Sequence, residues 1–452
     1  MPELTRYTGR ILERRTCMVA PVARDGRQRL SRDSYPVVLV PGIMGSRIEL
    51  EDGSDRIWDP DRTRFMAWLM TQSPDFRSRY FNHRLTPGRT MRVIYEEDNR
   101  QAPEGSMEAR IPQTRTDRNW ASVSWEYYGA GMAGIQADIA ADGGVLWCFG
   151  YDWRKSNLHN GRLLKEFIRD TVAPTSSLPP IIVTHSMGGL VTRAACAAHG
   201  MEDMIAGVVH TMMPTYGAAE AYGSQLHGTM GMPFRFLIGS TRLEINCVSS
   251  GVTGMYQLMP SSRYPHAWAS YDSQLFNHTI PNTPYSLSRP YEIYRESTGL
   301  IGIVDHSTFE ANVVNVGANT YVNNTRRMLQ HILDNIAEAE RYHETVVRDY
   351  CHPCTWLIAG TDQATVIDSS VHYHRDTVYG VELDPYSSCD LNTGSAGDAT
   401  VPLSSARILE SHANCRGGYI VSGIEHAQST NARVVIQGIG DLIRRIRDER
   451  YP

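Results

Sequence analysis

The chain has 452 residues, of which 41% are hydrophobic and 21% are charged, and its formal net charge is −5. These values are ordinary for a globular protein with a sizeable core, and the mildly acidic balance lacks the basic stripe that nucleic-acid binding requires. It also argues against strong electrostatic adhesion to an anionic membrane.

Targeting signals and cysteines restrict the location of the protein. No apolar run approaches the ~20 residues that span a bilayer, and the basic residues 1–15 lack the apolar stretch of a secretory signal peptide. We therefore expect a soluble protein made in the cytoplasm, with export by a signal-independent route as an alternative. Cys351 and Cys354 form a CxxC without the second pair of a zinc ribbon, so we predict free thiols, or one disulfide in an oxidising compartment.

The first predicted elements surround a long polar insertion. Residues 1–35 are polar and Arg-rich and predict an extension before the core, whereas the β-branched run at 35–40 ends at a Pro-Gly pair and indicates a buried central strand. Residues 51–120 are a polar insertion that contains an apolar segment with helical spacing. We take four residues of this insertion as candidates for a lid or for substrate contact: Trp58, Phe65, Trp68 and Met70.

The apolar segment at 65–70 has two interpretations of equal weight. It is either a lid helix or interfacial patch that reaches into lipid, or an ordinary helix packed under a cap.

Helices and strands then alternate along the chain. The apolar spacing predicts helices at 125–141, 162–171 and 190–198, and strands at 145–149, 181–183 and 208–209. This alternation predicts a mostly parallel central sheet with helices on both faces, whose first part is formed by residues 36–214.

Residues 215–350 break this rhythm, because they are rich in Gly, Ser, Tyr and Met and end in a long helical pattern at 323–347. We expect them to form a cap inserted into the core. Three core-like elements follow: strands at 355–359 and 418–421, and an amphipathic helix at 432–447. Residues 351–452 are therefore predicted to complete the sheet.

The strongest local signal is the run at 181–190, where a β-branched strand leads into Ser186, then small residues, then a helix. This pattern is typical of a nucleophile elbow, which exposes the hydroxyl and points helix N–H groups at a developing oxyanion. Thr184 stands where such elbows usually have glycine, so we expect a tighter turn. Ser186 is the predicted nucleophile, and the N–H groups of Met187 and Ile43 are the predicted oxyanion donors.

A serine nucleophile needs a base, and the base needs a carboxylate that orients it. In folds that carry such a nucleophile elbow, the catalytic residues occur along the chain in the order serine, acid, histidine. Asp398 and His426 follow late strands in that order. Asp362 is a rival acid because it directly follows a late strand. His210 follows the strand at 208–209, too early for the base, and His352 precedes the late strands, so we expect structural roles for both.

Five motifs occur in chain order: Val-Pro-Gly-Ile-Met-Gly-Ser at 40–46, Arg-Ile-Trp at 56–58, Tyr-Asp-Trp-Arg at 151–154, His-Ser-Met-Gly-Gly at 185–189 and Gly-Asp-Ala-Thr-Val-Pro at 397–402. Together they resemble the lecithin:cholesterol acyltransferase-like family of α/β-hydrolases, over roughly residues 36–430. The resemblance implies an α/β-hydrolase fold with an inserted cap or lid, and it favours Asp398 over Asp362. Ala399 departs from the family pattern, which usually has glycine there.

The resemblance also implies phospholipase A or acyltransferase chemistry through an acyl-serine intermediate. We expect a lipid or lipid-like ester as substrate, and transient contact with a membrane surface. No metal or organic cofactor is implied, and the sequence leaves the oligomeric state open. A soluble carboxylesterase for a non-lipid ester and an inactive hydrolase used for binding remain alternatives. Within the Tyr-Asp-Trp-Arg motif, we expect a buried ion pair between Asp152 and Arg154 and a core position for Trp153.

Overall fold

An eight-stranded sheet in the order β2-β1-β16-β11-β9-β8-β3-β7 forms the centre of the computed structural model. Six of these strands run parallel: β3 (Tyr35–Val40), β7 (Gly144–Cys148), β8 (Ile181–His185), β9 (Gly207–Thr211), β11 (Thr355–Thr361) and β16 (Cys415–Ser422). The structure describes residues 3–8, 11–14, 34–51, 53, 55–72, 74–81, 91–93, 118–227, 242–265, 269–271, 290–295, 318–374, 377–378, 381–382, 386–394 and 396–451.

Strand β3 explains how the sheet divides the core. Val38 and Val40 belong to one hydrophobic cluster, and Val37 and Leu39 belong to another. Because successive side chains of a strand point to opposite faces, β3 is buried on both sides, as a continuous β-branched run requires.

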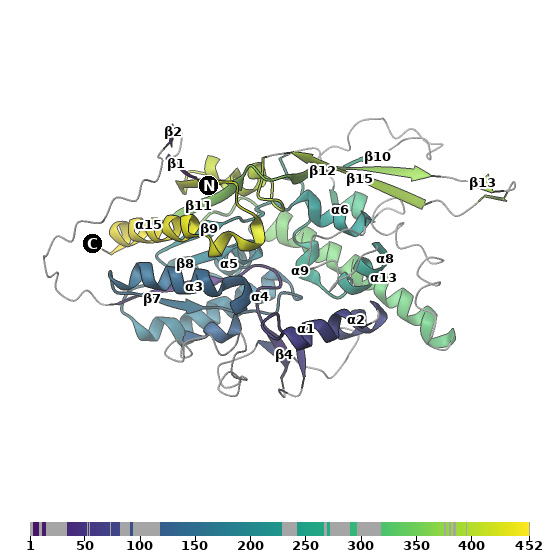
Figure 1. The fold of residues 1–452 in the computed structure, drawn as a ribbon, viewed down its shortest axis with the longest axis horizontal. Helices are drawn as coiled ribbons and strands as arrows, with labels where there is room; N and C mark the ends of the chain where they lie inside the picture. Colours follow the sequence, from purple (N-terminus) through teal and green to yellow (C-terminus); the bar gives the residue numbers. More distant parts are fainter. Residues whose placement is uncertain are drawn as a thin grey trace, which may run out of the picture.

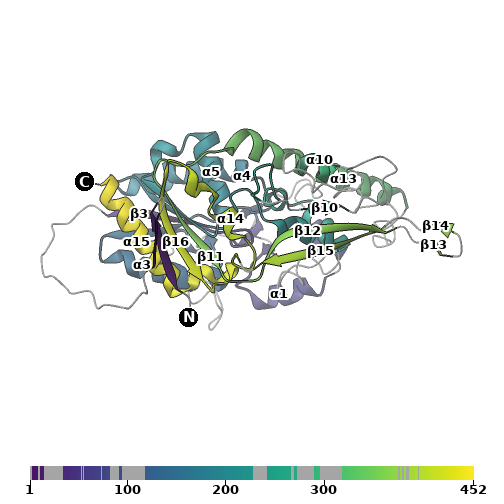
Figure 2. The same ribbon diagram turned by 90° about the horizontal axis from the view of Figure 1, so that it is seen from above.

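Helices cover both faces of the sheet, as the alternation of elements predicts. The helices α3 (Trp125–Ala140) and α15 (Arg433–Arg450) pack together on one face, and α4 (Asn157–Phe167) and α5 (Met187–His199) pack together on the other. Figure 2 shows the strands between these two pairs. The parallel strands therefore all end at one edge of a fully covered sheet, which is where ligands bind in open α/β folds.

Part of the predicted N-terminal extension belongs to the sheet. Strand β1 (Leu4–Thr8) pairs antiparallel with β16, and β2 (Ile11–Arg14) pairs with β1. Leu4 is buried in the cluster beneath α15. The sequence did not indicate this strand, because a single buried leucine among polar residues has no detectable period.

The described residues of 215–350 form a group of helices and the strand β10 (Ala269–Tyr271). The helices are α6 (Ala219–His227), α8 (Arg242–Ser249), α9 (Thr253–Tyr256), α10 (Pro290–Arg295) and α13 (Ala318–Glu340). Helix α13 continues as a π-helix over Arg341–Val347, so the helical pattern predicted at 323–347 is confirmed. No helix of the described residues is long and apolar enough to cross a membrane.

A long hairpin was not predicted from the sequence. Strands β12 (Thr365–His374) and β15 (Tyr386–Gly394) pair antiparallel and extend from the core towards the short pair β13 (Thr377–Val378) and β14 (Val381–Glu382) (Figure 1). Strand β10 adds to β12, and α6 packs on the hairpin. The two strands are rich in Ser, Asp, His and Asn, so they lack the apolar alternation that indicates a strand.

The start of the insertion at 51–120 is anchored to the core by buried charges. Strand β4 (Ile48–Leu50) precedes the insertion and pairs with its strands β5 (Arg56–Trp58) and β6 (Met91–Val93). The insertion also contains the helices α1 (Thr63–Met70) and α2 (Pro74–Phe81). The Arg47 guanidinium donates to both carboxylate oxygens of Asp59, at 2.8 and 3.0 Å. Asp61 accepts from the Ser124 hydroxyl and the Trp125 N–H at the start of α3, at 2.7 and 2.8 Å. Charge-assisted bonds of this kind are about twice as strong as neutral ones.

The CxxC segment has a structural role in the turn before β11. Cys351 and Cys354 are both buried and free, which is the first of the two states predicted for them. His352 accepts a hydrogen bond from the Cys354 N–H at 3.1 Å, and its other ring nitrogen lies 3.2 Å from the Glu202 carbonyl. His352 thus braces this turn, as predicted.

Candidate active site

Ser186 lies at the sharp turn between β8 and α5, at the carboxyl edge of the sheet. Its φ of 52° and ψ of −127° place an L-residue in a strained conformation. The Ser186 N–H donates to the Thr211 carbonyl on the neighbouring strand at 2.9 Å, which holds the turn against β9. The hydroxyl therefore projects beyond the sheet, as a nucleophile elbow requires.

Two hydrogen bonds in series join the three residues predicted for catalysis. The Ser186 Oγ lies 2.8 Å from His426 Nε2, and His426 Nδ1 lies 2.8 Å from Asp398 Oδ2. Asp398 is buried, and its other carboxylate oxygen accepts the N–H groups of Thr400 and Val401 at 3.1 and 2.7 Å. The backbone N–H of His426 also donates to the Asp398 carbonyl at 2.8 Å. Side-chain and backbone hydrogen bonds therefore both hold Asp398 and His426 together.

The turn after β3 lies directly against the elbow. A Cβ atom at Gly42 would stand 2.9 Å from the Ser186 Cβ, so only glycine allows this approach. Ile43 follows in the turn, and Met187 is the first residue of α5, whose leading N–H groups have no acceptor within the helix. Of the two predicted oxyanion donors, Met187 thus follows the serine directly and Ile43 follows the glycine that approaches it.

The family model described as lecithin:cholesterol acyltransferase matches residues 141–429, which is more than half of the chain and includes all three residues of the series. The chain belongs to this family. A chain of the solved structure "The crystal structure of Tle4-Tli4 complex" is 19% identical, with a TM-score of 0.69 over 92% of this chain and 99% of that chain. At that identity the likeness shows the fold alone, and it bears out the predicted α/β-hydrolase class. A search of curated proteins finds no match.

The structure accounts for the first departure from the family pattern, at Thr184. This side chain is fully buried, and its Oγ1 lies 2.8 Å from His210 Nδ1. The Thr211 hydroxyl donates to the Thr184 carbonyl at 2.8 Å. Burial lowers the pKa of His210 to about 3, so this histidine stays neutral and bonded to Thr184, away from Ser186.

The second departure is Ala399, which has a φ of 75°. Glycine adopts this left-handed region without steric cost, which explains the family's usual residue at this position. The Ala399 N–H donates to the Thr365 hydroxyl at 3.0 Å, and this bond helps to hold the alanine there.

The rival acid lies on the outside of the site. Asp362 follows β11 directly, but it is exposed and its carboxylate accepts a hydrogen bond from the Ser422 hydroxyl. Its φ of 64° is that of a turn residue. The structure therefore brings Asp398 to the histidine and leaves Asp362 elsewhere.

Trp58, one of the four lid or substrate candidates, is fully buried. Its Nε1 donates to the Met44 carbonyl at 2.8 Å, and its ring packs edge-on against Trp153, with 5.6 Å between ring centroids. Trp153 itself is buried, as predicted. Trp58 thus supports the turn after β3 from below and presents no surface to a substrate.

The other three candidates all belong to α1. Phe65 is half-buried, whereas Trp68 is 40% exposed and Met70 is 44% exposed. Trp68 also packs against Phe76 and Tyr80 of α2, with 5.6 and 5.7 Å between ring centroids. The helix thus buries Leu69 and exposes two large apolar side chains, and both interpretations of the segment stay predictions.

The ion pair expected in the Tyr-Asp-Trp-Arg motif is present and buried. Arg154 donates to both oxygens of Asp152, at 2.8 and 2.7 Å, and also to the Phe81 carbonyl at 3.1 Å. These bonds join the loop after β7 to the end of α2, so the pair braces the loop.

Three polar residues near the series were missed in the sequence. Tyr128 OH lies 2.7 Å from His185 Nδ1, and His185 Nε2 lies 3.2 Å from both the His426 carbonyl and the Ser429 Oγ. Tyr128 lies within the helix predicted at 125–141, where its apolar neighbours give no sign of a polar role, and the position of His185 directly before Ser186 is the one signal in the sequence.

Glu220, in the first turn of α6, is a fourth such residue. Its Oε2 atom is buried without a hydrogen-bond partner among the described residues. Burial raises the pKa of this carboxyl to about 7, although the nearby His426 acts in the opposite direction. Asp398 raises it further, so Glu220 lies within electrostatic range of the catalytic candidates. Nothing in its sequence surroundings indicated this.

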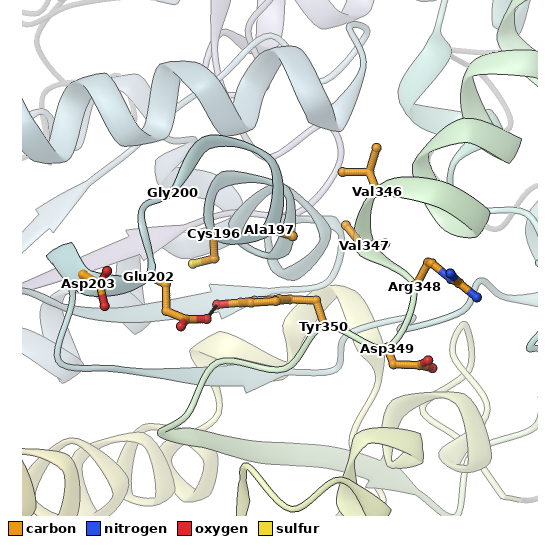
Figure 3. Close-up of a pocket in the computed structure, with 10 residues that line it drawn as sticks. All are labelled: Cys196, Ala197, Gly200, Glu202, Asp203, Val346, Val347, Arg348, Asp349 and Tyr350. Carbon is orange, nitrogen blue, oxygen red and sulfur yellow. Dashed lines mark hydrogen bonds between the residues drawn. The ribbon is translucent and has the colours of Figure 1, made fainter.

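A separate hollow of about 660 Å³ lies at the other end of α5 (Figure 3). It is lined by Cys196, Glu202 and Tyr350 among others, and the Tyr350 hydroxyl donates to Glu202 within it. Because α5 has 13 residues and rises by about 1.5 Å per residue, this hollow is roughly 20 Å from the elbow. It is therefore not part of the candidate active site.

Proposed function

We propose that the chain is a lipolytic serine hydrolase, which cleaves acyl esters of phospholipids or related lipids through an acyl-serine intermediate. The observation that carries the proposal is the series of two 2.8 Å hydrogen bonds from Ser186 through His426 to Asp398. Such a series lets a neutral imidazole accept the serine proton while a buried carboxylate orients the ring.

The first half of the reaction follows from this geometry. The Ser186 Oγ attacks the ester carbonyl carbon, and its proton passes to His426 Nε2 while Asp398 stabilises the imidazolium. The N–H groups of Ile43 and Met187 donate to the oxyanion of the tetrahedral intermediate. Its C–O bond to the leaving alcohol then breaks, the alcohol takes the proton from His426, and the acyl group remains on Ser186.

The second half regenerates the serine. Water, or the hydroxyl of a second alcohol, loses a proton to His426 and attacks the acyl-serine carbonyl. The bond between the acyl carbon and Ser186 Oγ then breaks and Oγ takes the proton from His426, which releases a fatty acid (hydrolysis) or a new ester (acyl transfer). Membership of a family named for acyl transfer from lecithin to cholesterol supports a lipid acyl donor. The exposed apolar side chains of α1 support contact with a lipid surface.

The test measures the products from vesicles of mixed phospholipids by mass spectrometry, for the wild type and for Ser186→Ala. We expect free fatty acid and lysophospholipid from the wild type, or an acylated alcohol when one is supplied, and a loss of roughly 10⁴-fold or more in the variant. Ser411→Ala removes an exposed serine hydroxyl outside the series and should match the wild type.

Other outcomes would favour the alternatives. Faster cleavage of short soluble esters, without activation by micelles, would indicate a carboxylesterase. Failure of the wild-type Ser186 to react with a serine-directed phosphonate would indicate an inactive hydrolase and overturn the proposal.

A further inference from the structure

A continuous path of hydrogen bonds connects the turn after β3 with the backbone carbonyl of His426. The Gly42 N–H donates to the Tyr128 hydroxyl oxygen at 2.8 Å, and that hydroxyl lies 2.7 Å from His185 Nδ1. On the other side of the ring, His185 Nε2 lies 3.2 Å from the His426 carbonyl oxygen.

The direction of every bond in the path follows from its ends. A carbonyl oxygen only accepts, so the His185 Nε2 facing it carries the proton, and Nδ1 of the neutral ring is an acceptor. The Tyr128 hydroxyl accepts from a backbone N–H, which leaves its own proton for Nδ1. The path therefore runs in one direction, from the Gly42 N–H to the His426 carbonyl, and selects one tautomer of His185.

The path is closed to water. Tyr128 and His185 are both buried, and the pKa of His185 is held well below its usual range by burial and by the neighbouring His426. The two imidazole rings are 4.9 Å apart between centroids. Ser429 adds a second link, because its hydroxyl donates to the same His426 carbonyl at 2.8 Å. A neutral ring in a single tautomer keeps the same hydrogen bonds throughout, so His185 can hold its neighbours in fixed positions without exchanging protons itself.

Packing makes the path sensitive to small shifts. A Cβ at Gly42 would lie 3.2 Å from His185 Nδ1 and 3.3 Å from the Tyr128 hydroxyl, as well as 2.9 Å from Ser186. The Gly42 peptide also leads directly into Ile43, the proposed oxyanion donor. A movement of Tyr128 thus changes where the oxyanion donor lies relative to the serine.

We propose that Tyr128 and His185 are positioning residues, which set the oxyanion turn and the backbone of His426 at a defined separation around Ser186. Neither touches the substrate. This inference rests on the proposed function, since it concerns how the same serine, base and oxyanion donors are aligned. Its consequence is that loss of the path slows the chemical step and leaves substrate binding unchanged.

The test compares Tyr128→Phe with Tyr342→Phe. Tyr342 is also fully buried, and its hydroxyl donates to a backbone carbonyl, that of Leu190, at 2.7 Å, so each variant deletes one buried tyrosine hydroxyl. We expect Tyr128→Phe to lower kcat by roughly 10- to 100-fold with KM within about twofold, and to slow phosphonate labelling of Ser186 equally. Tyr342→Phe should keep the wild-type kcat at a comparable loss of Tm.

A double-mutant cycle with His185→Gln tests whether the two residues act together. Because either change interrupts the same path, the double variant should lose little more kcat than the more impaired single variant. Additive losses, a kcat of Tyr128→Phe equal to that of Tyr342→Phe, or a change confined to KM would each overturn the positioning role. These results are distinct from failure of the proposed function, in which wild-type Ser186 itself would not react with the phosphonate.

Discussion

The sheet edge that carries Ser186 and the segment α1–α2 are held in place by different interactions. At the edge, directional hydrogen bonds of 2.8 Å join Ser186, His426 and Asp398, and the carboxylate accepts further backbone N–H groups. Between α1 and α2, the contacts around Trp68 are between aromatic rings, such as Trp68 and Phe76 at 5.6 Å between centroids, and α1 begins without a side-chain cap; Arg154 reaches only the end of α2.

This difference matches two kinds of task. Hydrogen bonds lose strength steeply when their angles change, so the edge holds reacting atoms in one arrangement. Contacts between rings have weaker directional preferences, and α1 leaves Trp68 and Met70 in solvent. We infer that the edge serves the chemistry and that α1 serves contact with an apolar surface, and three further experiments test this division.

The largest effect is expected at the buried end of the series. Asp398→Asn keeps the shape of the side chain but removes the charge that orients His426 and stabilises its imidazolium, so kcat should fall by roughly 10³- to 10⁴-fold. Asp362→Asn makes the same chemical change at the exposed rival and should leave kcat within a few-fold of wild type. The measurement is steady-state hydrolysis of a soluble ester, and similar losses in both variants would contradict the assignment of the acid.

An intermediate effect is expected at Glu220, whose pKa in the folded protein is raised to about 7 by burial. Between about pH 4.5 and 7 the folded state binds a proton that the unfolded state has lost, so this group makes the folded protein less stable as pH rises through that window. The loss should be roughly 1–3 kcal/mol, allowing for the partial exposure of the side chain.

Glu220→Gln removes the titration and should therefore stabilise the protein at pH 8 relative to wild type, with little difference at pH 4.5. Urea denaturation at the two pH values measures this. An equal stability difference at both would show that the carboxyl does not titrate between them.

The smallest effect is expected on α1. Met70→Ser removes an exposed apolar side chain, so activity on phospholipid vesicles should fall by roughly two- to fivefold, while activity on a soluble short-chain ester stays the same. Ala67→Ser, at another exposed position of α1, introduces the same hydroxyl without removing a large apolar group and serves as the control. An equal decrease on both substrates would place Met70 in the chemistry and remove the distinction between the two regions.

The sequence by itself determined the parallel core and the nucleophile candidate, because both depend on patterns between near neighbours. A short apolar run marks most of the buried strands, and the elbow at Ser186 lies within ten consecutive residues. Asp398 and His426 followed from the chain order of the fold and from the family motif around Asp398. The buried pair of Asp152 and Arg154 was also predicted, since its two members are separated by one residue.

Only the tertiary structure decided which distant residues meet. Leu4 pairs with Val421 across almost the whole chain, and Tyr128 meets His185 across 57 residues. Trp58 was expected near substrate and is buried instead, because a tryptophan has the same sequence signature in a lid and in a core. Such contacts depend on how packed elements bring side chains together, and no local period of the sequence encodes that placement.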